Sequence, residues 1–336
     1  MHKNLISSPV AHHRLKELDG WRGLAIILVL LAHFTHPPFI NAGALGVELF
    51  FVLSGRLMAE ILFVNKSPLP SFIRRRISRI YPVLLFTVVT LGIAFSSPSN
   101  PLHIDLPTAL SAATLTFNYY SLFQPISHVL DHIWSLCVEE HSYIFLAVLA
   151  FICRRYNLTV LPILFIAAGL FMLNGLYQSW DGASSVYWRS DVHAASILLS
   201  AAVYMLAQSP QCKRLLSGFT APIFTCLGII LFSTKMPEFI QFTLGTACLA
   251  IAVNGITEMP SSLRKLLAFR PLAYVGVVSY SLYLWQQPFY KLAQNTSTLI
   301  HLLLLFAALA TGIGSYYLLE TPSRRWLNAY WAKRGY

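Results

Sequence analysis

The sequence predicts an all-α, polytopic membrane protein with about ten transmembrane helices and both termini in the cytoplasm. The first observation is composition: apolar and aromatic residues make up 56% of the 336 residues and charged residues only 11%, against roughly 25% charged in soluble domains. The second is a series of apolar runs of roughly 20 residues, each long enough to cross a hydrocarbon core of about 30 Å as a helix. The third is that Lys and Arg gather in alternate loops between these runs, as they do in cytoplasmic loops.

The predicted spans lie near residues 21–37, 43–64, 81–97, 133–152, 158–176, 191–207, 220–234, 238–257, 272–293 and 298–319. A weaker stretch at 107–123 contains Thr, Ser, Asn118, Tyr119 and Tyr120. That polarity favours a re-entrant or interfacial segment over a full span.

The loop charges predict the topology. With the N-terminus inside, the outside segments carry only Arg189, Lys235 and Lys291, while nearly all other Lys and Arg residues fall inside. This divides the chain into an N-terminal cytoplasmic tail (1–16), a transmembrane domain (17–325) and a C-terminal cytoplasmic tail (326–336). A cleavable signal peptide is the alternative for the first run, but His33, Phe34 and His36 follow it where a small-x-small cleavage site is required.

The net charge of +11 does not indicate nucleic-acid binding, because such proteins carry their basic residues in surface stripes and here they separate apolar runs. The five cysteines are scattered in or beside those runs, which excludes a disulfide-built secreted domain.

Charged residues inside spans are costly and are therefore functional candidates. Arg22 and His33 are eleven residues apart, which places them on one helix face about 16 Å from each other, so one elongated ligand could reach both. Arg22 lies at the cytoplasmic mouth beside the basic residues Arg74, Arg75, Arg76 and Arg79. Such a cluster can hold phosphates; anchoring to anionic lipid is the alternative. For a lone histidine such as His33, the alternative is an interhelical hydrogen bond.

Three of the carboxylates inside the spans are candidates for the site or its neighbours. Glu48 is level with His33 in the outer half, where a carboxylate would orient an imidazole. Glu139 and Glu140 lie one to two turns inside the fourth span, and Glu139 is a second candidate partner for His33 or for a substrate hydroxyl. Arg56 and Glu60 have i, i+4 spacing, and we expect them to neutralise one another.

Around Glu139, we predict that Trp134, Ser135 and Tyr143 bind the acceptor, with a place in the interfacial aromatic belt as the alternative for the two aromatic residues. No metal is expected: His128 and His132 lack a third strong ligand fixed by spacing. Nucleophile elbows, phosphate-cradling Gly loops and Cys-x-x-Cys pairs are missing from the sequence. Acylation of Ser54 or Ser135 is open as an alternative, but direct transfer needs fewer groups.

Taken together, these segments resemble the integral-membrane acyltransferase-3 family from about Arg14 to Arg325. The resemblance rests on Arg22-x10-His33, on Phe-Ile-Arg-Arg-Arg-Ile-Ser-Arg-Ile-Tyr-Pro at 72–82 and on Trp-Ser-Leu-x-x-Glu at 134–139, supported by segments 46–55, 279–288 and 320–325. The motifs are specific in combination, whereas any one alone would be weak.

The resemblance implies O-acylation, most often O-acetylation, of sugars in bacterial surface polysaccharides, with acyl-CoA as the cytoplasmic donor. Arg22 and His33 match the family's essential pair, Arg76 and Arg79 its arginine motif, and Glu139 its glutamate. Two positions depart from the family. Gln286 stands where a histidine is usual, so no catalytic role is expected there, and Arg56 stands where the family is usually apolar.

We therefore expect a multi-pass O-acetyltransferase of the bacterial inner membrane that moves an acetyl group from acetyl-CoA to a hydroxyl of a cell-surface glycan or lipid-linked sugar. Arg22, Arg75, Arg76 and Arg79 would hold CoA phosphates and His33 would be the general base, with the acceptor arriving from the periplasmic side. The alternative is a transporter of a small anionic or sugar-like solute, although no pair of broken helices in matching halves marks an inverted repeat.

Overall fold

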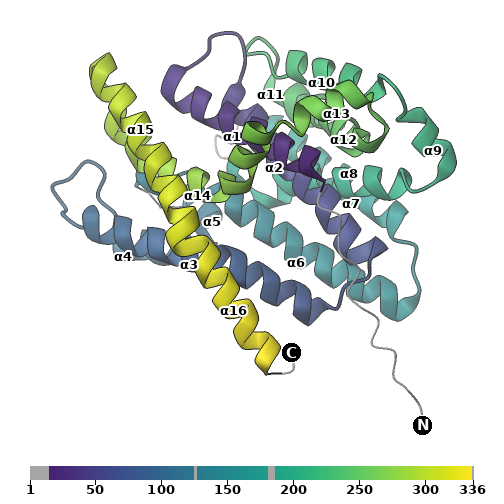
Figure 1. Ribbon diagram of the computed structural model, residues 1–336, viewed down its shortest axis with the longest axis horizontal. Helices are drawn as coiled ribbons and strands as arrows, with labels where there is room; N and C mark the ends of the chain where they lie inside the picture. The colour runs from purple at the N-terminus through teal and green to yellow at the C-terminus, as the bar shows by residue number, and fades with distance from the viewer. Residues whose placement is uncertain (1–14, 125–126, 181–185, 335–336) are drawn as a thin grey trace.

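The computed structural model describes residues 15–124, 127–180 and 186–334, and within them the chain is helical, with one isolated β-bridge between Ile40 and Ser233 (Figure 1).

The longer helices are α1 (Lys16–Thr35), α2 (Ala42–Ala59), α3 (Leu69–Ala94), α6 (Ile133–Tyr156), α7 (Val160–Trp180), α8 (Ser190–Leu206), α10 (Thr220–Leu231), α14 (Arg270–Ala293), α15 (Thr298–Ser315) and α16 (Thr321–Lys333). The shorter ones are α4 (Leu106–Ala113), α5 (Phe117–Tyr120), α9 (Pro210–Leu215), α11 (Glu238–Ile240), α12 (Thr246–Asn254) and α13 (Ser261–Leu267). Three π-helical turns, η1 (Glu60–Val64), η4 (Gln241–Gly245) and η6 (Tyr316–Glu320), continue α2, join α11 to α12 and join α15 to α16. Single 3-10 turns are η2 (His128–Leu130), η3 (Val186–Trp188) and η5 (Ile256–Glu258).

The all-α prediction is confirmed for the described residues, and each of the ten predicted stretches coincides with helix. Five helices are long and apolar enough to cross a membrane, or six if α13 and α14, bent by 49°, form one span. Helix α8, helix α10 and the segment Glu238–Asn254 are apolar but shorter. The chain is thus a multi-pass membrane protein, and the count of about ten spans and the sides of the termini stay predictions.

The boundaries differ from the prediction at three places. Helix α3 begins at Leu69, so the arginines expected in a loop lie on its first turns. The stretch 107–123 forms α4 and α5, separated by a turn in which Leu115 has a φ of 58°. Of the expected C-terminal tail, residues 326–333 are helical as part of α16, whereas the N-terminal tail lies almost wholly outside the described residues.

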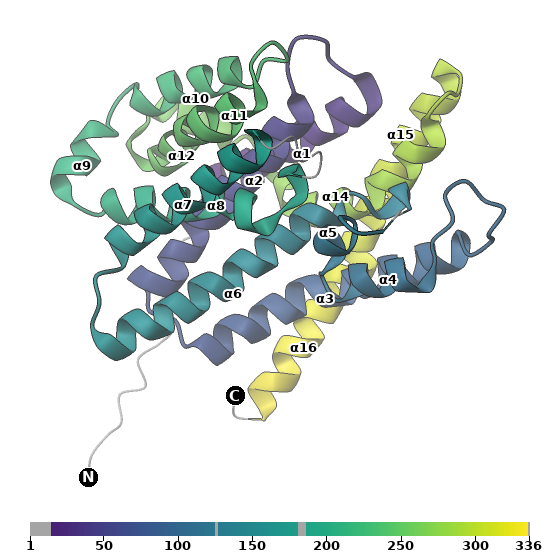
Figure 2. The same cartoon turned by 180° about the vertical axis from the view of Figure 1, so that it is seen from behind.

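Helix α1 packs against both α14 and α2 (Figure 2). Glycines bring these backbones together. A Cβ on Gly276 would lie 1.7 Å from the Asp19 carbonyl oxygen, and one on Gly23 would lie 2.2 Å from the Leu272 carbonyl oxygen. Small residues at such crossings are how membrane helices approach closely. This packing fixes the position of α1 relative to α14.

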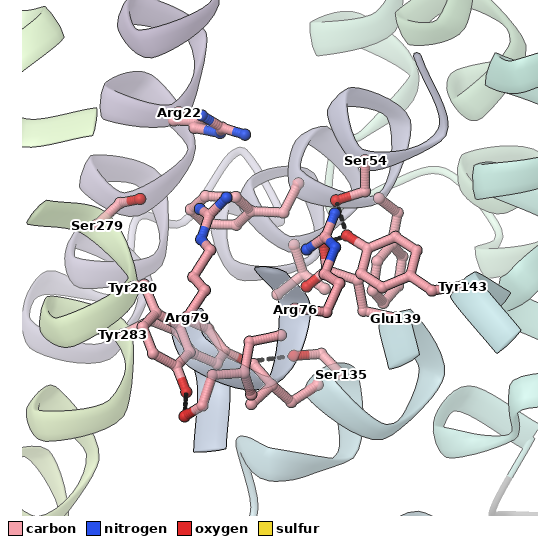
Figure 3. Close-up of a pocket in the computed structure, with 15 residues that line it drawn as sticks. Arg22, Ser54, Arg76, Arg79, Ser135, Glu139, Tyr143, Ser279, Tyr280 and Tyr283 are labelled. Atoms are coloured by element: carbon pink, nitrogen blue, oxygen red, sulfur yellow. Dashed lines mark hydrogen bonds between the residues drawn. The ribbon is translucent and has the colours of Figure 1, made fainter. Parts of the chain in front are cut away.

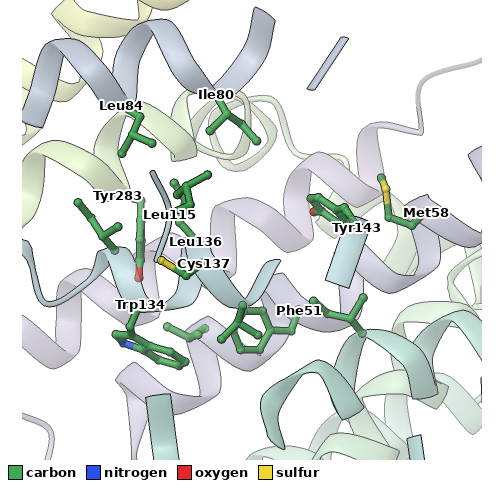
Figure 4. Close-up of a cluster of buried hydrophobic side chains, with 14 of the residues drawn as sticks. Phe51, Met58, Ile80, Leu84, Leu115, Trp134, Leu136, Cys137, Tyr143 and Tyr283 are labelled. Carbon is green, nitrogen blue, oxygen red and sulfur yellow. The ribbon is translucent and has the colours of Figure 1, made fainter. Parts of the chain in front are cut away.

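The largest buried cluster lies where α2, α3, α6 and α14 meet (Figure 4). It includes Phe51 and Met58 of α2, Leu84 of α3 and Leu136 of α6, all of them buried. Helices α15 and α16 form one long rod that runs across these elements (Figure 1). The Ser78 hydroxyl donates to Asn328 Oδ1 at 3.1 Å, which ties this rod to α3.

Candidate active site

An arginine-rich pocket lies between α1, α2, α3, α6 and α14 (Figure 3). Arg22 comes from α1, and Arg76 and Arg79, three residues apart on one face of α3, come from a distant part of the chain. Glu139 is the single acidic side chain among the described residues that line this pocket. Of the four basic residues that the sequence placed beside Arg22, the structure brings Arg76 and Arg79 to the same pocket. We call this space the arginine pocket.

Arg76 and Arg22 are held in the pocket by different kinds of contact. The Arg76 guanidinium lies 3.9 Å from the centre of the Tyr143 ring, a cation–π distance, and its Nη2 lies 3.3 Å from Met58 Sδ. Arg22 Nη1 lies 3.4 Å from Asp19 Oδ1 in the same helix. Among the described residues, no carboxylate oxygen lies within 4.0 Å of the Arg76 or Arg79 guanidinium. The Arg76 and Arg79 guanidinium groups are thus not engaged in close ion pairs, and planar guanidinium groups match phosphate well.

Glu139 shares the arginine pocket with a group of hydroxyls. Its Oε1 accepts hydrogen bonds from the Ser54 and Tyr143 hydroxyls, which lie 2.8 Å from each other. The Ser135 hydroxyl lies 2.6 Å from that of Tyr283, which also lies 2.9 Å from the His132 carbonyl oxygen. Three predicted residues, Glu139, Ser135 and Tyr143, therefore line the same pocket as the arginines, in a setting that can hydrogen-bond a polar ligand.

His33 lies near the C-terminal end of α1 and is not among the described residues that line the arginine pocket. Its Nδ1 lies 2.6 Å from Gln286 Oε1, and its ring stacks on Tyr290 at 4.4 Å between centroids. Nearby, Lys291 Nζ lies 3.1 Å from Asp131 Oδ2. Burial raises the pKa of the Asp131 carboxyl, while Lys291 and His128 act against that shift. The structure thus places His33 in a second polar cluster. The side chain that contacts its ring nitrogen is the Gln286 amide, where the sequence analysis expected a carboxylate.

The placement of Glu48 corrects the prediction that it lies beside His33. Glu48 Oε1 accepts from the Thr246 hydroxyl at 2.5 Å, and its Oε2 lies 3.8 Å from Nδ1 of His193. Both members of the pair are buried, 1% exposed for Glu48 and 3% for His193. Glu48 therefore does lie beside an imidazole, but this is the imidazole of His193 on α8. The reason is that the face of α2 that carries Glu48 packs against α8 and α12.

Arg75 and Trp134 also lie outside the arginine pocket. Successive residues of a helix point 100° apart, and the side chain of Arg75 is exposed while Arg76 faces inward. Trp134 is buried in the core, in edge contact with Phe51 at 5.9 Å and with His193 at 5.6 Å between ring centroids. Neither side chain is placed where the predicted CoA or acceptor contact would require.

The expected pairing of Arg56 with Glu60 does not form either. Arg56 Nη1 lies 3.4 Å from both the carbonyl oxygen and Oδ1 of Asn254, and its guanidinium lies over the Tyr204 ring at 4.8 Å. Arg56 therefore joins α2 to α8 and α12.

The pocket also contains residues that the sequence analysis did not single out. Ser279, Tyr280 and Tyr283 of α14 line it, because α14 packs along α1. The sequence signal was the run Ser-Tyr-Ser-Leu-Tyr at 279–283, which is polar for the middle of a span. Among the described residues, no group of three His, Cys, Asp or Glu side chains is arranged to hold a metal.

Known proteins with similar sequences provide an independent comparison. O-acetyltransferase OatA of Staphylococcus aureus (strain NCTC 8325 / PS 47) is 28% identical over 350 residues, which cover 93% of this chain and 57% of that protein. Putative peptidoglycan O-acetyltransferase YrhL of Bacillus subtilis (strain 168) is 28% identical over 82% of this chain and 49% of its own length. Peptidoglycan O-acetyltransferase OatA of Listeria monocytogenes is 28% identical over 81% of this chain and 48% of its own length. The chain thus spans about half the length of the curated relatives it matches.

No solved structure matches the chain significantly. The family described as "Acyltransferase domain" matches residues 15–320, which include both the arginine pocket and the His33–Gln286 contact. Because the match covers nearly the whole chain, this protein belongs to that acyltransferase family.

Proposed function

We propose that this protein moves an acetyl group from acetyl-CoA to a hydroxyl of a cell-surface glycan or lipid-linked sugar at the bacterial inner membrane. The observation that carries the proposal is the arginine pocket, in which Arg22, Arg76 and Arg79 meet from two distant helices, with Glu139 as the one acidic side chain among the described lining residues. The similarity to peptidoglycan O-acetyltransferases over most of the chain supports the reaction class and a glycan acceptor.

In this proposal the three arginines hold the phosphates of CoA and the pantetheine arm extends along α1 toward His33. Eleven helical residues separate Arg22 from His33, about 16 Å along the axis, a distance that an extended pantetheine arm spans. The thioester is then presented near the imidazole while the nucleotide end stays at the arginines.

The chemical step needs a base because a neutral sugar hydroxyl is a poor nucleophile. His33 Nε2 takes the hydroxyl proton as the sugar oxygen attacks the thioester carbonyl. The new C–O bond forms, the C–S bond breaks, and the proton passes from the imidazolium to the CoA thiolate. Glu139 and the hydroxyls of Ser54, Ser135 and Tyr143 lie in the arginine pocket, where they hydrogen-bond the polar part of the donor or a sugar hydroxyl.

Deletion of the gene in its host, followed by NMR of the O-acetyl groups in each surface glycan, tests the function in the cell. We expect one glycan, with peptidoglycan as the first to examine, to lose its O-acetyl signal and to regain it with the wild-type gene but not with His33→Gln. A transporter of a small solute is the rival function. Loss of solute uptake with every glycan O-acetyl signal intact would favour the transporter and contradict the proposal.

A further inference from the structure

Two neighbouring glutamines of α14 connect the His33 imidazole, through a chain of hydrogen bonds, to the main-chain carbonyl of His128. Gln286 Oε1 lies 2.6 Å from His33 Nδ1, and Gln286 Nε2 donates to Gln287 Oε1 at 3.3 Å. Gln287 Nε2 in turn donates to the carbonyl oxygen of His128 at 3.3 Å. Gln286 is 1% exposed and Gln287 3%, so water does not compete freely for these groups.

The last member of this chain fixes the direction of every hydrogen bond in it. A main-chain carbonyl can only accept, so Gln287 must turn its NH₂ group toward His128 and its oxygen toward Gln286. Gln286 must then offer its own NH₂ to Gln287 and its oxygen to His33. An amide oxygen only accepts, and the His33 nitrogen that faces it must therefore carry the proton. The neutral imidazole is left with its proton on Nδ1 and its lone pair on Nε2.

We propose that Gln286 and Gln287 are positioning residues that hold His33 in the tautomer required of a general base. This inference rests on the proposed function, in which Nε2 of His33 accepts the sugar proton. It assigns to Gln286 the orienting role that a carboxylate has in many His-based sites, but with a neutral group. A neutral amide orients the ring without adding the negative charge that would stabilise the imidazolium, so the proton is more readily passed on to the thiolate.

The ring is fixed from two further directions. Tyr290, one turn after Gln286 on α14, stacks on the imidazole with an interplanar angle of 8°. The close approach of α1 and α14 at Gly23 and Gly276 sets the register that places His33 opposite Gln286. The charged and titratable groups near the imidazole are His36 on the end of α1, Lys291 on α14 and His132 before α6. None of them replaces the acceptor that Gln286 provides to Nδ1.

The first test compares Gln286→Leu and Gln287→Leu with Gln294→Leu, an exposed glutamine just beyond α14 that serves as the matched control. In the purified full chain, we expect Gln286→Leu to lower kcat by on the order of 10-fold or more, within the 10² to 10⁴ that a general base contributes, while the Kd for CoA is unchanged. Gln287→Leu should have a smaller effect in the same direction, since the Gln286 amide could then rotate. Gln294→Leu should leave kcat unchanged.

The second test uses Gln286→Glu, which keeps an acceptor for Nδ1 but adds charge. The carboxylate stabilises the imidazolium, so the free base appears only at higher pH, and we expect the acid limb of the kcat–pH profile to move up by about 1 to 3 pH units. A purely structural glutamine would not move that limb. If Gln286→Leu does not fold, this variant alone decides: an unmoved acid limb overturns the proposal.

The third test reads the tautomer directly by ¹⁵N NMR of histidine-labelled protein, with the His33 signal identified as the one lost in His33→Gln. We expect the proton on Nδ1 in the wild type and a mixture of tautomers in Gln286→Leu. A proton on Nε2 in the wild type would overturn the inference whatever the activity shows. Full activity of His33→Gln together with the Nδ1 tautomer would instead contradict the proposed function and leave the hydrogen-bond chain intact.

Discussion

The Cβ that an alanine at position 276 would carry lies 1.7 Å from the carbonyl oxygen of Asp19, so α14 and α1 touch backbone to backbone at this point. Arg22 and Ser279 lie one turn further along the two helices, and both line the arginine pocket. This close contact between α1 and α14 therefore holds Arg22 and Ser279 in position at the candidate site.

Gly276→Ala should therefore separate α1 from α14. We expect a loss of about 1 to 3 kcal/mol of stability, as for other overpacked sites, measured by thermal unfolding in detergent, together with lower acetyl transfer. Gly92→Ala is the matched control, since no heavy atom lies within 4 Å of its Cβ. Equal unfolding temperatures for the two variants would contradict the close packing of α1 on α14.

The pair Arg75 and Arg76 tests which arginines hold the donor. Arg76→Ala removes a guanidinium from the pocket, and since a hydrogen bond to a charged group contributes about 1.5 to 3 kcal/mol, we expect the Kd for CoA to rise about 10- to 100-fold. Arg75→Ala removes the same charge from an exposed position and should change the Kd little. Calorimetry with CoA makes the comparison. Equal losses in the two variants would indicate a general charge effect in place of a defined site.

Tyr143 offers a way to separate donor binding from hydroxyl chemistry. Tyr143→Phe keeps the ring under the Arg76 guanidinium but removes the hydroxyl from Glu139 and Ser54. We expect an unchanged Kd for CoA and a several-fold rise in KM for the acceptor, the effect of one hydrogen bond of about 1 kcal/mol. Tyr143→Ala should weaken CoA binding as well. Steady-state kinetics with both substrates decides, and a weaker CoA complex in Tyr143→Phe would show that the hydroxyl itself serves the donor.

Glu48 should contribute to stability without taking part in transfer. Glu48→Ala leaves the buried Thr246 hydroxyl and the His193 imidazole without this partner, and we expect a loss of about 1 to 3 kcal/mol in stability. Glu48→Gln retains an oxygen that can accept from Thr246 and should lose less. Thermal unfolding gives the order of the variants. A folded Glu48→Gln protein whose kcat falls as far as that of His33→Gln would restore Glu48 to the catalytic group.

The sequence was sufficient for the helices and for part of the site, because both follow from local patterns. Apolar runs located the long helices other than α16, and the Arg22, Arg76 and Glu139 motifs proved to share one pocket. Arg75 was misplaced because a run of three arginines does not say which one faces inward. That direction depends on how α3 is rotated about its own axis within the bundle.

Partner choice between distant helices was beyond the sequence. Glu48 pairs with His193 and Thr246, and His33 pairs with Gln286, over separations of more than a hundred residues. The sequence predicts only that a carboxylate lies at the same depth in the membrane as His33, and it does not say which one contacts the imidazole. The choice is made by the packing of α1 on α14 and of α2 on α8, where glycines such as Gly55, whose Cβ would lie 2.1 Å from the Ile197 carbonyl oxygen, set the distance.

We propose that CoA binds at the arginines from the cytoplasmic side and delivers its acetyl group toward His33 in the outer half of the membrane. The most direct measurement uses proteoliposomes of known orientation, with labelled acetyl-CoA on the cytoplasmic face and a membrane-impermeant glycan acceptor on one face only. We expect label on acceptor supplied at the periplasmic face, with His33→Gln slower by on the order of 10² to 10⁴. Label confined to acceptor on the cytoplasmic face, or transfer that His33→Gln leaves unchanged, would contradict it.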